Sequence, residues 1–295
     1  MGIVGLFSTA LRGMRPVADA VRTAELIAEG EGHITILPGD PEETRRLREL
    51  LGSPEQAPDE DAFYILAATR GTDLSAGGVA LARARRRNPR DALAVVIGTS
   101  AEREALEREL LEEHRLEPSN VVHVASLEGS GADAVVDRVI DMLGDVAVVA
   151  GRRTPALRQA IGHRVVRSAA LQSAAVGAVP LGGATTPVIT LQQIRMVGQL
   201  ATLHGVQPVG ADRVLAALGI LAAGFGWRAL ARGLVGFVPG VGWVIQGGMA
   251  YGVTRTMGEV VHARLAAGHD LLEGPGVEAI KPKVDAILAR LGRDS

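Results

Sequence analysis

The sequence predicts an α/β domain with a doubly wound parallel sheet of about four strands, followed by an all-α domain rich in glycine and apolar residues. Three observations support this fold class. Short apolar runs alternate with helical patterns between residues 33 and 144, as they do in parallel sheets covered by helices. Charged residues become sparse beyond residue 160. The chain also contains 37 glycines but only 3% aromatic residues, which favours close packing of small side chains.

The expected strands are short runs rich in Val, Ile and Leu, at residues 33–37, 62–68, 92–97 and 121–125. Helical patterns follow them at residues 41–51, 74–87, 101–115 and 132–143. Parallel strands joined by helices almost always form right-handed crossovers. We therefore expect right-handed connections throughout this domain, which we assign to residues 31–150.

The junction between the first strand and the first helix is where folds of this class hold phosphate. A phosphate loop needs the pattern G-x-x-x-x-G-K-[ST], which supplies a second glycine, a lysine and a hydroxyl for the phosphates and Mg²⁺. Thr44, Arg45 and Arg46 stand at those three positions here. Only Gly39 and Pro41 remain of the pattern.

The residues that replace the phosphate loop predict the start of a helix. Asp40 is expected to cap this helix, Pro41 to occupy its first position, and Glu43 to complete a capping box. Glu42 adds a further negative charge near the positive end of the helix dipole. The protein's own carboxylates would then fill the anion site, so we expect no nucleotide cofactor at this loop.

Later segments resemble Era-like GTPases. Residues 61–71 resemble the strand that follows switch II in that family, and residues 125–131, with Gly129 and Gly131, resemble its last guanine-contacting loop. Residues 94–101 fall where the family has its guanine-reading N-K-x-D. There, the Asn, Lys and Asp are replaced by Gly98, Thr99 and Ala101.

This resemblance implies a degenerate P-loop-like fold without GTPase activity. Only about ten residues separate the first helix from the next strand, whereas a complete GTPase places both switches and two strands in that gap. The metal-ligating Thr and the D-x-x-G motif therefore have no room. An unrelated doubly wound domain is the alternative interpretation.

The second domain, assigned to residues 151–274, is basic and apolar. Residues 160–260 carry seven Arg, no Lys and two acids, a formal charge of +5, so the rest of the chain carries −7 to give the total of −2. This segregation favours a membrane surface over nucleic acid as the partner, because the Arg residues are sparse and aromatics few.

Two runs without charged residues are long enough to cross a bilayer. They comprise 27 residues between Arg167 and Arg195 and 22 residues between Arg232 and Arg255. Pro and Gly interrupt both, so hairpins or interfacial helices are expected at 168–179, 188–203, 213–235 and 243–264. Arg228 and Arg232 share one face and could reach anionic headgroups. Gly248 and Gly252 form a G-x-x-x-G pair that permits close helix packing.

Residues 157–265 resemble the bacterial domain-of-unknown-function 697 family, which is found in inner-membrane proteins and is often linked to GTPases. Five short motifs carry this resemblance in the family's order and spacing, through the residues Pro180, Gln193, Met196, Gly205, Pro239, Gly240 and Gly242, and through the segment 251–258. His204 stands where the family commonly has Tyr. The resemblance implies membrane association and a GTPase as a partner, but no activity.

Enzyme chemistry finds little support in the sequence. The chain has no Cys, its seven His show no metal-type spacing, and no G-x-S-x-G nucleophile motif is present. We expect no catalytic residue, metal or cofactor. Amphipathic helices are predicted at residues 1–30 and 275–295. The first is expected to pack on the next domain or to lie on a membrane, and the second to dock on the α/β domain or on a partner helix.

Three functions follow from these observations. The first is a non-catalytic adaptor on the cytoplasmic side of the cell membrane, which would bind membrane lipid, a membrane protein, a partner GTPase or a second copy of itself. The second is a nucleotide-responsive switch with an unorthodox site near Gly129 and Gly131. The third is a cytoplasmic protein-binding module whose apolar helices form a buried core.

Overall fold

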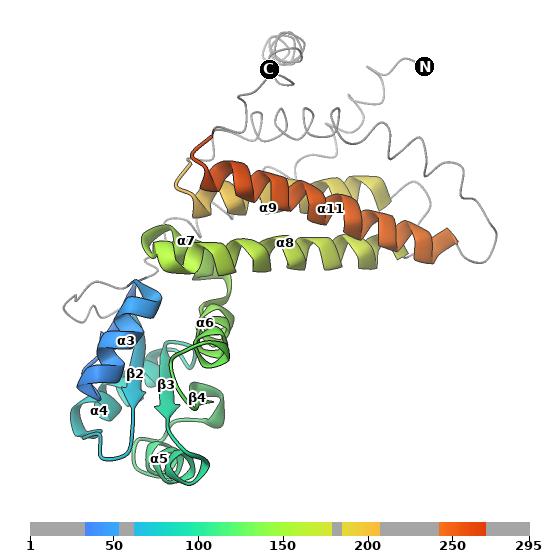
Figure 1. Ribbon diagram of the computed structural model, residues 1–295. Coiled ribbons are helices and arrows are strands. Elements are labelled where there is room, and N and C mark those ends of the chain that lie inside the picture. The colour runs from blue at the N-terminus through green and yellow to red at the C-terminus, as the bar shows by residue number, and fades with distance from the viewer. Residues whose placement is uncertain (1–32, 53–61, 179–184, 207–241, 270–295) are drawn as a thin grey trace, which may run out of the picture. The chain divides into compact units, whose positions relative to one another are not determined.

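The computed structural model describes residues 33–52, 62–178, 185–206 and 242–269 (Figure 1). They fall into two compact units that divide between Ile161 and Gly162. The helices expected at 1–30, 213–235 and 275–295 lie outside the described residues.

The first unit is built on a parallel sheet of four strands. These are β1 (Ile34–Leu37), β2 (Phe63–Ala68), β3 (Ala92–Ile97) and β4 (Val121–Val124), and they lie side by side in the order β1-β2-β3-β4. β2 and β3 are buried along their whole length, as strands with helices on both faces must be. The predicted α/β fold class is confirmed.

Helices alternate with these strands. They are α3 (Pro41–Leu51), α4 (Ser75–Arg87), α5 (Ser100–Glu112) and α6 (Ser130–Leu143), and α7 (Ala147–Arg153) follows. Short 3-10 turns lie at Pro118–Asn120 and Gly144–Val146. α5 ends three residues earlier than expected, because Arg115 adopts a left-handed conformation (φ 54°) and the Leu116 N–H bonds back to the Leu110 carbonyl.

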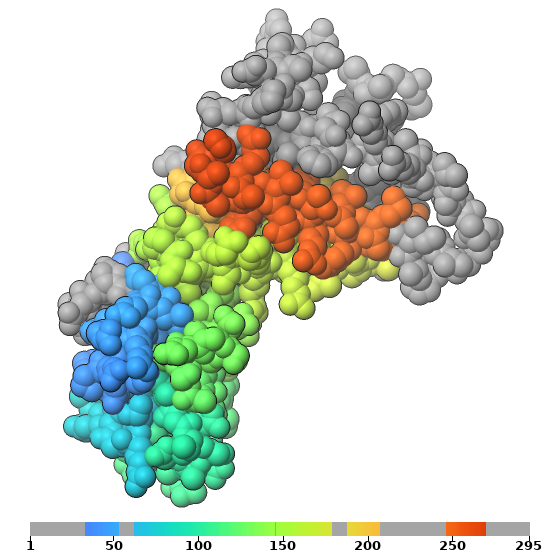
Figure 2. Space-filling view, viewed as in Figure 1, coloured from blue at the N-terminus to red at the C-terminus, as the bar shows by residue number. Residues whose placement is uncertain are grey.

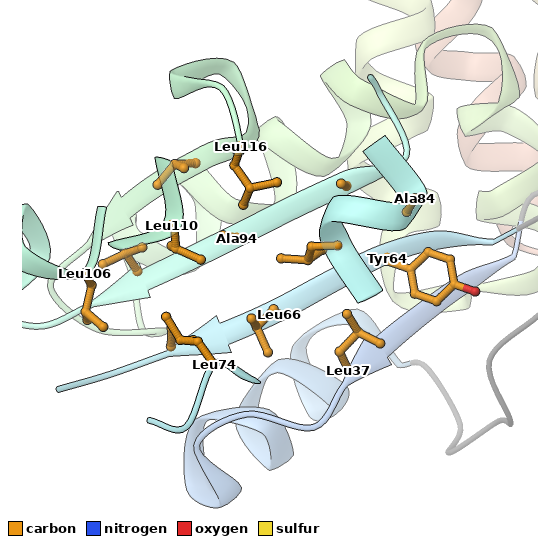
Figure 3. Close-up of a cluster of buried hydrophobic side chains, with 14 of the residues drawn as sticks. Leu37, Tyr64, Leu66, Leu74, Ala84, Ala94, Leu106, Leu110 and Leu116 are labelled. Carbon is orange, nitrogen blue, oxygen red and sulfur yellow. The ribbon is translucent and has the colours of Figure 1, made fainter. Parts of the chain in front are cut away.

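One face of the sheet packs against α4 and α5. The core on this face contains alternate strand residues together with Leu81 of α4 and Leu106 and Leu110 of α5 (Figure 3). Leu47 and Leu51 of α3 are fully buried but do not belong to this cluster. Figure 1 shows α3 and α6 together on the opposite face of the sheet.

The placement of α3 corrects the expectation of right-handed connections throughout. The chain steps across the sheet in one direction from β1 to β4, so crossovers over opposite faces must have opposite hands. The crossovers through α4 and α5 have the common right hand. The crossover from β1 through α3 to β2 is left-handed, as the view from the α4 side shows (Figure 3).

In its described part, the second unit contains three long helices. α8 (Pro155–Ala178) enters it at Gly162 and is longer than the helix expected at 168–179, while α9 (Thr185–Leu203) and α11 (Gly242–Ala266) lie close to the expected ranges. α11 runs antiparallel to α8, because Gly162 meets His262 at one end and Gly177 meets Gln246 at the other. Figure 2 shows α8 and α11 in direct contact. Within the described ranges, no helix is both long and apolar enough to cross a membrane.

Candidate functional site

The carboxyl edge of the sheet holds the loop that stands in place of a phosphate loop. Asp40 caps α3, as predicted: its Oδ1 accepts hydrogen bonds from the backbone N–H groups of Glu42 (3.1 Å) and Glu43 (3.0 Å). Its Oδ2 accepts a third, from the hydroxyl of Thr69 (2.9 Å) after β2. These hydrogen bonds, that from Glu43 first, hold the pKa of Asp40 below its ordinary value.

The backbone donors from Asp40 to Thr44 are therefore occupied. The Asp40 N–H donates to the Ala67 carbonyl (3.3 Å) and the Thr44 N–H to the Asp40 carbonyl (2.8 Å), while Pro41 has no N–H. Glu42 and Glu43 donate to the Asp40 carboxylate. A phosphate loop works by pointing such N–H groups at its ligand, and here an internal carboxylate has taken that place.

Gly39 is needed for the packing of the loop against β2. A Cβ at this position would clash with the Ala67 carbonyl oxygen and touch the side chain of Leu66. In a phosphate loop, such a glycine lets the backbone come close to the ligand. Here Gly39 lets the backbone come close to the neighbouring strand β2 instead. Thr44 is buried, and its hydroxyl has no hydrogen-bond partner among the described residues.

The two arginines of the degenerate motif bind acids of their own helix. Arg45 pairs with Glu49 (2.8 Å), and Arg46 pairs with Glu42 (2.7 Å) and with Glu43 (3.0 Å). Glu43 therefore does not complete the expected capping box with Asp40, because its carboxylate turns to Arg46 and the Asp40 N–H is already bonded to β2.

The loop at the position of the guanine-reading motif is also closed by its own side chains. Gly98 has a positive φ of 143°, and Thr99 and Glu102 form a capping box at the start of α5. Glu102 Oε2 accepts from the Thr99 hydroxyl (2.7 Å) and backbone N–H (3.1 Å), and these bonds lower its pKa. Ala101 is exposed and offers no carboxylate for a base.

The loop before α6 differs from the other two. Gly129 has a φ of 50°, and Gly131 is essential because a Cβ there would clash with the Ser126 carbonyl oxygen. Within the described part of the chain, no side chain caps α6. Two glycines therefore contribute to the shape of this loop in place of a capping side chain.

The motif residues of the helical unit have several different environments. Gln193 of α9 donates to the Thr254 hydroxyl of α11 (3.2 Å), and Met196 packs against Gly258. Gly205 ends α9 with a φ of 73°. Gly242 is the first residue of α11. Pro180, Arg228, Arg232, Pro239 and Gly240 lie outside the described residues.

The expected close packing of Gly248 and Gly252 is not seen within the described unit. Both glycines are exposed, and a Cβ at either position would meet no described atom within 4 Å. Gly247 and Gly258 make the close contacts instead: a Cβ on Gly247 would lie 3.1 Å from the Ala174 carbonyl oxygen of α8. The G-x-x-x-G pair thus faces outward from the helices described.

Sequence reasoning missed a cluster of three histidines, because they are far apart in the chain and show no regular spacing. His163 of α8, His204 after α9 and His262 of α11 come together in the helical unit. Across the described ranges, no group of three or more His, Cys, Asp or Glu side chains has a geometry that could hold a metal ion.

Comparison with known proteins identifies no relative: no family model, no curated protein and no solved structure matches this chain. The resemblances to Era-like GTPases and to the domain-of-unknown-function 697 family therefore rest on their short motifs alone.

Proposed function

We propose that this protein is a non-catalytic adaptor or scaffold built on a GTPase-like domain that has lost its nucleotide site. The observation that supports it best is the Asp40 carboxylate, which accepts the N–H groups that a phosphate would need. The helical domain would attach this scaffold to the cytoplasmic face of the cell membrane, through anionic lipid or a membrane protein.

Electrostatics around α3 argue against a bound triphosphate. Asp40, Glu42 and Glu43 bring three carboxylates to the start of the helix, and Arg46 is already paired with two of them. Like charges at short range cost about 1 kcal/mol or more each, even when screened. The favourable helix dipole, worth roughly 0.3–1 kcal/mol, does not offset this repulsion.

Nucleotide binding tests the first half of the proposal. Fluorescent GTP and GDP would be titrated with the full chain, with an active GTPase as positive control, and we expect no saturable binding at roughly tens of micromolar. The triple variant Thr44→Gly, Arg45→Lys, Arg46→Ser should not bind either, because the guanine-reading residues are also absent. Saturable, Mg²⁺-dependent binding by the wild type would overturn the scaffold and favour the switch near Gly129 and Gly131.

Sedimentation with vesicles tests the second half. Vesicles of phosphatidylcholine with and without phosphatidylserine would be mixed with the full chain, and we expect binding that depends on the anionic lipid. The double variant Arg228→Glu, Arg232→Glu should lose this binding. The double variant Arg45→Glu, Arg48→Glu in the α/β unit is the matched control and should retain it.

A soluble protein-binding module is the second candidate. It is favoured by the finding that no described helix is long and apolar enough to span a bilayer. Cell membranes washed with high salt and then with alkaline carbonate separate the two candidates. If the protein stays in the supernatant before any wash and does not bind anionic vesicles, the membrane adaptor is wrong and the protein-binding module is favoured.

A further inference from the structure

Three helices of the second unit bring histidine rings together around His262. This residue is only 3% exposed, although it lies near the end of α11. Its Nδ1 is 3.1 Å from Nε2 of His204, and its ring meets that of His163 edge-on with the centroids 5.5 Å apart. A Cβ on Gly162 of α8 would overlap the ring, so the glycine makes the space that the imidazole fills.

The hydrogen bond between His204 and His262 requires a particular protonation state. A neutral imidazole carries one N–H and one bare nitrogen, so one ring can donate to the other. If both rings are protonated, two N–H groups face each other at this distance and two positive charges lie in contact. The bond therefore exists only while at least one of the two rings is neutral.

The surroundings of His262 favour its neutral form. Its Nε2 is buried and has no hydrogen-bond partner among the described residues, so a proton added there would meet no acceptor. Among the described residues, the charged or titratable groups that face it are His163 from α8, His204 just after α9 and Glu259 from α11. Glu259 favours the charged form of His262, but it offsets the other influences only in part, because its carboxylate lies 3.3 Å from Nδ1 of His163.

We propose that these histidines form a proton-sensitive contact that fastens the carboxyl end of α11 to α8 and α9 at neutral pH and releases it in mild acid. The pKa of His262 agrees with this: burial of the ring lowers it first, and His163 lowers it further, against the opposing effect of Glu259. A pKa below the unfolded value means that the unfolded state binds more protons, so stability falls as pH decreases below about 6.5. The inference does not depend on nucleotide or membrane binding.

Hydrogen exchange of the full chain tests the proposal. Protection factors, corrected for the intrinsic pH dependence of exchange, would be compared at about pH 7.5 and about pH 5, on either side of the histidine range. We expect peptides from α11 to lose protection in acid, and peptides from α4 in the other unit to lose much less. His262→Phe keeps a ring of similar shape but cannot gain a proton, so it should abolish the acid-dependent loss.

The control is His269→Gln, which removes an exposed histidine of the same unit and should leave the loss unchanged. The proposal is wrong if α11 keeps its protection at acid pH, or if His262→Phe loses protection as the wild type does. If this variant does not fold, an NMR titration of the seven histidines of the wild type decides the question. At least one must then titrate well below the ordinary range, and seven ordinary titrations would refute the inference.

Discussion

Replacing Asp40 with alanine removes a carboxylate that accepts three hydrogen bonds. Two come from backbone N–H groups of α3, and the third comes from the Thr69 hydroxyl and links the start of α3 to the end of β2. Loss of a helix cap costs about 1 kcal/mol. Loss of a hydrogen bond to a charged group costs about 1.5 kcal/mol. We therefore expect Asp40→Ala to lower the stability of the α/β unit by about 2–3 kcal/mol.

Urea unfolding of the full chain, followed by hydrogen exchange in peptides from α3, measures this loss. Asp40→Asn keeps acceptor oxygen without the charge and should lose less. Because the pKa of Asp40 is held below its ordinary value, its contribution is present above pH 3.8 and is lost as pH falls through the folded-state pKa. The difference in unfolding free energy between the wild type and Asp40→Ala should therefore become smaller in acid. Exposed Glu49→Ala is the control, and an Asp40→Ala loss no larger than that of the control would refute the role given to Asp40.

Four further substitutions test the packing, each by thermal or urea unfolding against the wild type. Gly39→Ala should cost about 1–3 kcal/mol, because its Cβ clashes with the Ala67 carbonyl; full stability would show that the loop does not rest on β2. Asn120→Ala should cost about 2–3 kcal/mol, since this fully buried amide donates to two backbone carbonyls, and a neutral effect would contradict that role. Gly258→Ala should destabilise the helical unit, because the added Cβ would lie 2.7 Å from a methyl group of α8. Gly252→Ala should stabilise it by about 0.5–1 kcal/mol, because no described atom lies within 4 Å of the added Cβ. Equal effects of the two substitutions would show that α11 is rotated differently.

The strands and the first helix could be predicted because their signals are local. β2 and β3 are continuous apolar runs, and β1 and β4 are mostly apolar with one polar residue each. α3 begins at an Asp-Pro pair that is typical of a helix start. The end of α5 was misplaced because its apolar pattern continues to Leu116, whereas the backbone turns at Arg115. No local sequence signal indicates which face of the sheet α3 covers, because that choice depends on the whole sheet.

Of the candidate site, the sequence revealed the capping role of Asp40 but not the contact with Thr69, which lies 29 residues away. The same limit explains the histidine cluster, whose hydrogen bond joins residues 58 apart. In α11 the error was one of helix rotation. Gly247, Gly248, Gly252 and Gly258 are all available for close packing, and only their rotation relative to α8 and α9 decides which of them touch a neighbour.

The left-handed crossover through α3 is unusual, because about 98% of such crossovers are right-handed. A right-handed path over the face that carries α3 would lead from β1 to a strand on the side away from β2, and the described sheet has no strand there. The chain returns directly to β2 instead. Leu47 and Leu51 of α3 are fully buried, so their apolar packing helps to hold the helix on this face. The Asp40 carboxylate fixes the start of the same helix, because it accepts two of its N–H groups and also the Thr69 hydroxyl at the end of β2.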